Sequence, residues 1–93
     1  MKILIIEDNE ILSNNIKTFL SLEGLDATQL FSGEKALYEL SAQSYDLVIL
    51  DIGLPGVDGI SLCKNIRENG QAVPILMLTA RNAKQDKQSG FEF

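Results

Sequence analysis

The chain has 93 residues and a formal net charge of -5, with 45% hydrophobic and 23% charged residues. These values are ordinary for one globular domain and exclude a disordered chain, and because no basic cluster occurs, neither nucleic acid nor an anionic membrane is an expected direct partner. With no histidine and one cysteine, the chain has neither histidine-based chemistry nor an internal disulfide, which fits a cytoplasmic location. No apolar run is long enough to span a bilayer.

Short apolar runs alternate with helical spacing in the first half of the chain. The continuous run 3–6 predicts a strand buried on both faces. A helix is expected next, with Asn9 as its N-cap and Gly24 at its end. A strand over 25–30 follows, and then a second helix capped by Ser32. The apolar faces predicted for these two helices are Leu12, Ile16, Phe19 and Leu20, and Ala36, Leu37 and Leu40.

The second half continues the same alternation. A turn-rich loop over 53–57 separates its first strand from its first helix. The helix carries Leu62, Cys63 and Ile66 on one face, where Cys63 is expected to pack in the core. The predicted elements, in order, are a strand over 47–50 that ends at Asp51, a helix between its N-cap Asp58 and Gly70, a strand over 75–78 and a helix over 82–89.

This strict alternation predicts an α/β fold with one parallel sheet and helices on both faces. Two strand orders remain open, a flavodoxin-like order with the first strand beside the third, and a Rossmann-like order. The first strand–helix turn has no Gly-x-Gly-x-x-Gly pattern and the chain has no Gly-Lys-Ser/Thr loop. Dinucleotide and P-loop sites are therefore disfavoured.

Acidic residues follow two of the predicted strands. Glu7 and Asp8 come after the first strand, and Asp51 ends the third. In a flavodoxin-like order these strands are neighbours, and ligands bind beyond their carboxyl ends. Any one acid alone is more simply a cap or a solvated turn residue. Three carboxylates in one crevice repel one another, and Mg²⁺ relieves the conflict, so the set predicts a metal site.

A carboxylate beside Mg²⁺ can also act as a nucleophile. Asp51 in that position can attack phosphorus and form an acyl phosphate. Thr79 ends the fourth strand, next to the third, and its hydroxyl can donate a hydrogen bond to a phosphoryl oxygen. A strand-end threonine taken alone is more often a turn residue, but the small Ala80 beside it leaves room for a phosphoryl group.

Three stretches together are highly specific. The pair Glu7-Asp8, the stretch 51–59 with its Asp-x-x-x-Pro-Gly-x-Asp-Gly pattern, and Leu78-Thr79-Ala80 resemble the receiver domain of bacterial two-component response regulators. Within that family, the sequences of the last two stretches most resemble those of receivers that precede a winged-helix DNA-binding domain. The resemblance runs along the whole chain, and it implies a flavodoxin-like three-layer sandwich with strand order 2-1-3-4.

The resemblance also implies a role for each site residue. Asp51 is the phosphoacceptor for a sensor histidine kinase, and Thr79 is the switch hydroxyl. Asp8, Asp51 and the carbonyl of Gly53 ligate Mg²⁺, for which Mn²⁺ can substitute, while Glu7 helps through water. Such a protein is a signalling switch and not a conventional enzyme, although self-dephosphorylation is compatible with it. It controls transcription through an output domain outside this segment, so this segment itself contacts neither DNA nor a membrane.

The chain departs from the family pattern at its C-terminus. A receiver has a fifth strand and helix, including a lysine that pairs with the phosphoryl group, and neither Lys84 nor Lys87 stands at the matching place. Residues 1–93 are therefore expected to form one receiver domain that is C-terminally incomplete, either as a fragment of a longer regulator, which is favoured, or as a short gene product. Such a segment is expected to be poorly stable or to self-associate, with a homodimer as one outcome.

Two other functions remain open. A pseudo-receiver is a binding module that uses the fold without phosphorylation; the missing lysine favours it, whereas Asp8, Asp51 and Thr79 argue against it. A haloacid-dehalogenase-type phosphatase also uses an aspartate nucleophile with Mg²⁺. That family typically has a second aspartate two positions later, where this chain has Gly53.

Overall fold

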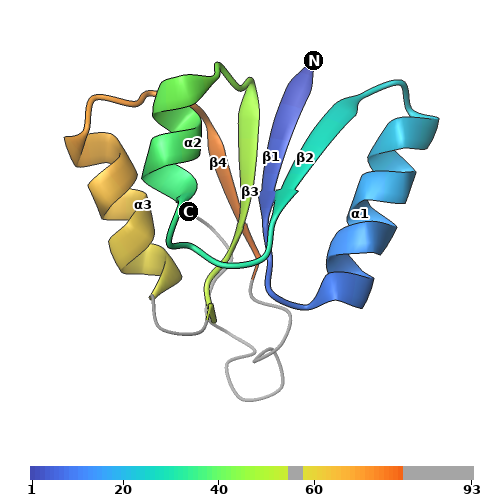
Figure 1. Ribbon diagram of the computed structural model, residues 1–93, viewed down its shortest axis with the longest axis horizontal. Coiled ribbons are helices and arrows are strands. Elements are labelled where there is room, and N and C mark those ends of the chain that lie inside the picture. The colour runs from blue at the N-terminus through green and yellow to red at the C-terminus, as the bar shows by residue number, and fades with distance from the viewer. Residues whose placement is uncertain (55–57, 79–93) are drawn as a thin grey trace.

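The computed structural model describes residues 1–54 and 58–78, in which four parallel strands form one sheet. One helix, α1 (Glu10–Leu22), covers one face of the sheet, and two helices, α2 (Ala36–Ala42) and α3 (Gly59–Glu68), cover the other (Figure 1). The strands are β1 (Lys2–Ile6), β2 (Asp26–Leu30), β3 (Leu47–Asp51) and β4 (Ile75–Leu78). None of the helices in this described part is long and apolar enough to cross a membrane.

The order of the strands is β2-β1-β3-β4, with β1 paired to both β2 and β3. This confirms the flavodoxin-like order and excludes the Rossmann-like one, in which the first strand would not lie beside the third. The four strands fall where the apolar runs predict them, within one residue at each end. The predicted helix over 82–89 falls outside the described residues.

Each face of the sheet has its own apolar core, because successive strand residues point to opposite faces. In β1, Ile3 and Ile5 pack toward α1, while Leu4 and Ile6 pack toward α2 and α3. All four are buried, which is why the run reads as continuously apolar. Cys63 is half-buried and packs against the core on the α2–α3 side, as predicted.

The ends of α1 and α3 use the predicted caps. The Asn9 side chain accepts a hydrogen bond from the Leu12 backbone N–H at 3.0 Å, and the Asp58 side chain accepts one from the Ile60 N–H at 3.2 Å. Gly24 and Gly70 follow the two helices with φ of 79° and 84°, a left-handed conformation that glycine adopts without strain. Asn9 and Asp58 thus mark where the two helices start, and Gly24 and Gly70 mark where they end.

Two local predictions are wrong. Ser32 does not cap α2: the chain turns at 32–35, the Ala36 N–H bonds to the Gly33 carbonyl, and the helix begins at Ala36 with no side-chain cap. Phe19, predicted to lie on the apolar face of α1, is 62% exposed. The helix instead turns Ser13 inward, where its hydroxyl accepts a 2.8 Å hydrogen bond from Gln29 of β2. This rotation carries Phe19 toward solvent.

Candidate functional site

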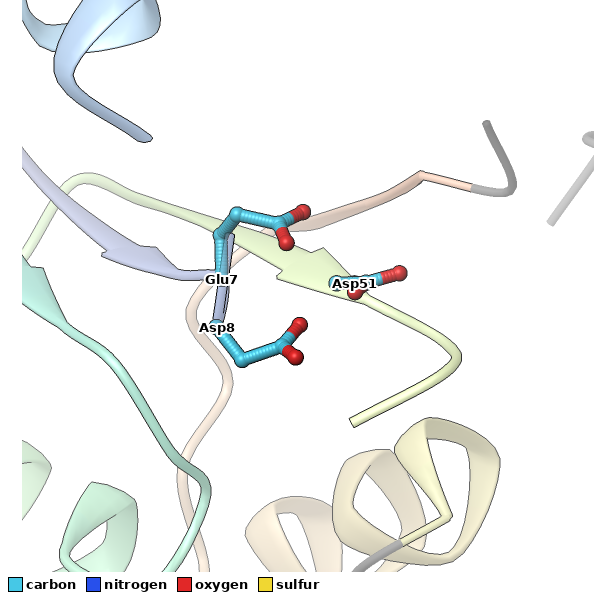
Figure 2. A group of neighbouring side chains, drawn as sticks. All are labelled: Glu7, Asp8 and Asp51. Carbon is cyan, nitrogen blue, oxygen red and sulfur yellow. The ribbon is translucent and has the colours of Figure 1, made fainter. Parts of the chain in front are cut away.

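The acids predicted to converge lie together at the carboxyl edge of the sheet. β1 ends at Ile6, which pairs with Leu50 of β3, so the next residues, Glu7 and the last β3 residue Asp51, lie side by side. Asp8 follows directly. Figure 2 shows the three carboxylates extending in the same direction, beyond the ends of β1 and β3.

The three carboxylates form one compact cluster. One oxygen of each of Glu7, Asp8 and Asp51 lies within 4.8 Å of the others. Glu7 and Asp51 are each only 1% exposed, and Asp8 is half-buried. Charges that are so close and so little hydrated interact strongly, at roughly 3 kcal/mol per pair with an effective dielectric constant of about 20.

Backbone N–H groups orient two of these carboxylates. The Asn9 N–H donates to Glu7 Oε2 at 2.9 Å, and the Gly53 N–H donates to Asp51 Oδ1 at 3.1 Å. The cluster also lies at the N-terminus of α1, whose first helical residue is Glu10. The partial positive charge at this helix end favours nearby anions. The fold therefore holds the Glu7 and Asp51 carboxylates in defined orientations at this edge of the sheet.

The donor set fits a hard divalent cation. Mg²⁺ binds oxygen ligands at about 2.0–2.1 Å, so two ligand oxygens on one ion are up to about 4 Å apart. Carboxylate oxygens within 4.8 Å of one another can close on such an ion with a small adjustment, or through a bound water. The charges also match, because a dication offsets the repulsion within the cluster.

Of the other predicted site residues, the structure describes Gly53 but not Thr79. Gly53 is half-buried beside Asp51, to which its N–H donates, and the metal-binding role of its carbonyl stays a prediction. Thr79 and the loop residues 55–57 lie outside the described residues. The structure thus brings together Glu7, Asp8, Asp51 and Gly53, and the switch role of Thr79 also stays a prediction.

One residue beside the site was given no role by the sequence reasoning, although it ends the 51–59 pattern. Gly59, the first residue of α3, donates its N–H to the Ile52 carbonyl at 2.9 Å, next to Asp51. A Cβ there would lie 2.5 Å from Ile52 Cα and 2.7 Å from the Asp51 carbonyl oxygen. A signal was present, since glycine is a poor helix former and its place directly after an N-cap aspartate indicates a close backbone approach.

Known proteins resemble this chain along nearly all of its length. The response regulator receiver domain family matches residues 3–93. The transcriptional regulatory protein CiaR of Streptococcus pneumoniae is 42% identical over 92 residues, which are 99% of this chain and 41% of that protein. The two-component response regulator PhoP of Pseudomonas aeruginosa is 40% identical over 90 residues, which are 97% of this chain and 40% of that protein. The chain therefore spans about two fifths of the length of these relatives.

A solved structure resembles this chain in both fold and overall sequence. The receiver domain of the sensor histidine kinase PA1611 from Pseudomonas aeruginosa superposes with a TM-score of 0.80 and 35% identity, over 98% of this chain and 80% of that one. That protein is described with a magnesium ion coordinated in its active site cleft. The resemblance predicted from the three sequence stretches is thereby confirmed, and so is the likeness to receivers of transcription regulators.

Proposed function

The chain belongs to the response regulator receiver family, and from this premise we propose that Asp51 accepts a phosphoryl group from a sensor histidine kinase in a Mg²⁺-dependent reaction. The observation that carries the proposal is the convergence of Glu7, Asp8 and Asp51 at the ends of two adjacent strands. A cluster of anions that holds one well-oriented aspartate suits a cation and a phosphoryl group together.

In the proposed reaction, a carboxylate oxygen of Asp51 attacks the phosphorus of a phosphohistidine on the kinase. An O–P bond forms, the N–P bond breaks, and the imidazole nitrogen keeps the electron pair and takes up a proton. The hydrogen bond from the Gly53 N–H holds the Asp51 carboxylate in a defined rotation during the approach. The Thr79 hydroxyl is proposed to donate to an oxygen of the new phosphoryl group.

The proposed metal ligands are Asp8, Asp51 and the carbonyl of Gly53, with Glu7 acting through a water. When bound, Mg²⁺ neutralises negative charge on the phosphoryl group as it is transferred. The support from this structure is the hard-oxygen donor set and its spacing. Mn²⁺ has similar ligand preferences and is proposed as a substitute.

The proposed output is control of transcription from the cytoplasm. Residues 1–93 are proposed to be the receiver part of a regulator, because the relatives named above are transcriptional or response regulators more than twice as long. DNA contact then belongs to an output domain outside this segment. Receiver domains of this kind are not conventional enzymes, and slow hydrolysis of its own acyl phosphate is the one reaction proposed for the chain besides phosphoryl acceptance.

Labelling with a small phosphodonor tests the proposal directly. Acetyl phosphate with Mg²⁺ is expected to add one phosphoryl group to the chain, seen by intact-mass spectrometry, and a chelator added beforehand is expected to prevent it. Hydroxylamine, which cleaves acyl phosphates, is expected to remove the adduct. A chain that is never labelled while it binds Mg²⁺ would instead favour a binding module.

A second copy of the chain is the proposed partner for an exposed part of the sheet. Among the described strands β4 lies at an edge, and Leu76 on it is 53% exposed on the face that bears α1. An apolar edge strand tends to find a partner. Leu76→Arg is expected to reduce self-association in light scattering, whereas Tyr38→Arg, at an exposed site on α2, is not. A monodisperse parent monomer with a cooperative melt would contradict the dimer.

A further inference from the structure

The N-terminus of α3 rests directly on the backbone that follows Asp51. A Cβ built on Gly59 would lie 2.5 Å from Ile52 Cα, 2.7 Å from the Asp51 carbonyl oxygen and 3.0 Å from the Ile52 carbonyl oxygen. All three atoms belong to the backbone, so no side chain can swing away to make room. Any side chain at this position therefore requires α3 and the Asp51–Ile52 peptide to move apart.

That peptide is held by hydrogen bonds from several directions. The Ile52 N–H donates to the Leu78 carbonyl of β4 at 3.1 Å, and the Ile52 carbonyl accepts from the Gly59 N–H at 2.9 Å. One residue later, the Gly53 N–H donates to Asp51 Oδ1. Since β4 holds one side of Ile52 and α3 the other, a shift of α3 moves both the Asp51 carboxylate and Gly53.

We propose that Gly59 is a positioning residue for the metal site, setting the placement of Asp51 and Gly53 through its contact with Ile52. This inference rests on the proposed function, because it concerns the same metal ligands. Gly59 touches neither metal nor phosphoryl group. By linkage, the coupling must also run the other way, so that metal binding tightens the contact between Gly59 and Ile52.

The test compares two glycine variants at the two ends of α3. Gly59→Ala adds a methyl group against the Asp51–Ile52 backbone, whereas Gly70→Ala adds one in open space at a φ of 84°, where alanine is strained. Both changes are expected to destabilise the fold, so only an effect on the site separates them. Each variant is titrated with Mn²⁺, followed by electron paramagnetic resonance of the free ion, under conditions where denaturation curves show it folded.

The Gly59→Ala variant is expected to bind Mn²⁺ about 10- to 100-fold more weakly than the parent chain, as for other changes behind metal ligands. Gly70→Ala is expected to keep the parent affinity. If the parent binds and Gly59→Ala binds equally well, this inference is overturned while the proposed metal site stands. If the parent itself binds no Mn²⁺, both fail.

A measurement on the parent chain covers the case in which Gly59→Ala does not fold. Saturating Mg²⁺ is expected to slow amide hydrogen exchange of the Gly59 N–H, which bonds to Ile52, more than that of the Gly70 N–H, which bonds to the Arg67 carbonyl. Equal slowing at the two sites would mean general stabilisation only. That result, or no slowing at Gly59, overturns the inference.

Discussion

Asp51→Asn is expected to abolish phosphoryl labelling by acetyl phosphate, the largest single effect predicted for this chain. Asparagine has nearly the same shape, and its side-chain oxygen can still accept the hydrogen bond from the Gly53 N–H. What it lacks is an anionic oxygen able to attack phosphorus. Because the variant keeps the local geometry, a loss of label reports the chemistry of one side chain and not a collapse of the site.

Asp26→Asn is the matched control for this experiment. Asp26 is exposed at the start of β2, at the opposite end of the strands from the acidic cluster, and its replacement changes the net charge by the same amount. The control variant is expected to be labelled like the parent, with the same Mg²⁺ requirement. An adduct that persists in Asp51→Asn would show that another residue accepts the phosphoryl group.

The convergence of the acids was predictable because it depends on strand order alone. Residues that follow two adjacent parallel strands must emerge at the same edge of the sheet, whatever the details of packing. The convergence of Glu7 and Asp51 requires only that β1 pairs with β3, and that pairing is present. Hydrophobic periodicity left two strand orders open, however, and the family resemblance was needed to choose between them.

Features that depend on contacts between distant segments were not predictable from local pattern. Helical spacing groups Phe19 with Leu20, but α1 is rotated so that Ser13, which accepts a hydrogen bond from Gln29, is buried while Phe19 is exposed. The tight fit of Gly59 against Ile52 is a contact between two backbones; a glycine directly after an N-cap aspartate indicates a close approach, but the local pattern does not identify Ile52 as the partner. In both cases the partner lies in another segment of the chain, outside the helix concerned.

Mg²⁺ is expected to stabilise the fold through the same cluster, and Asp8→Asn is expected to remove most of that gain. A ligand that binds only the folded chain adds RT ln(1 + [L]/Kd), which is about 2.7 kcal/mol at a hundredfold excess over Kd. If the variant binds about a hundredfold more weakly, the same Mg²⁺ concentration adds only about 0.4 kcal/mol. Asp8 is the informative site because it is a proposed direct ligand. It is also half-buried, whereas Glu7 and Asp51 are fully buried, so its substitution is expected to disturb the core less.

Urea denaturation of the parent, Asp8→Asn and Asp26→Asn, each with and without Mg²⁺, measures these gains. The quantity compared is the metal-dependent change in unfolding free energy within each variant, so any effect of a substitution on the metal-free fold cancels. Asp26→Asn is expected to show the full parental gain, and NaCl at matched ionic strength is expected to reproduce none of it, because screening does not replace a dication held by several carboxylates. An equal gain in all three chains would place the bound Mg²⁺ away from Asp8, whereas a gain lost in Asp8→Asn alone ties the ion to the carboxylates at the ends of β1 and β3.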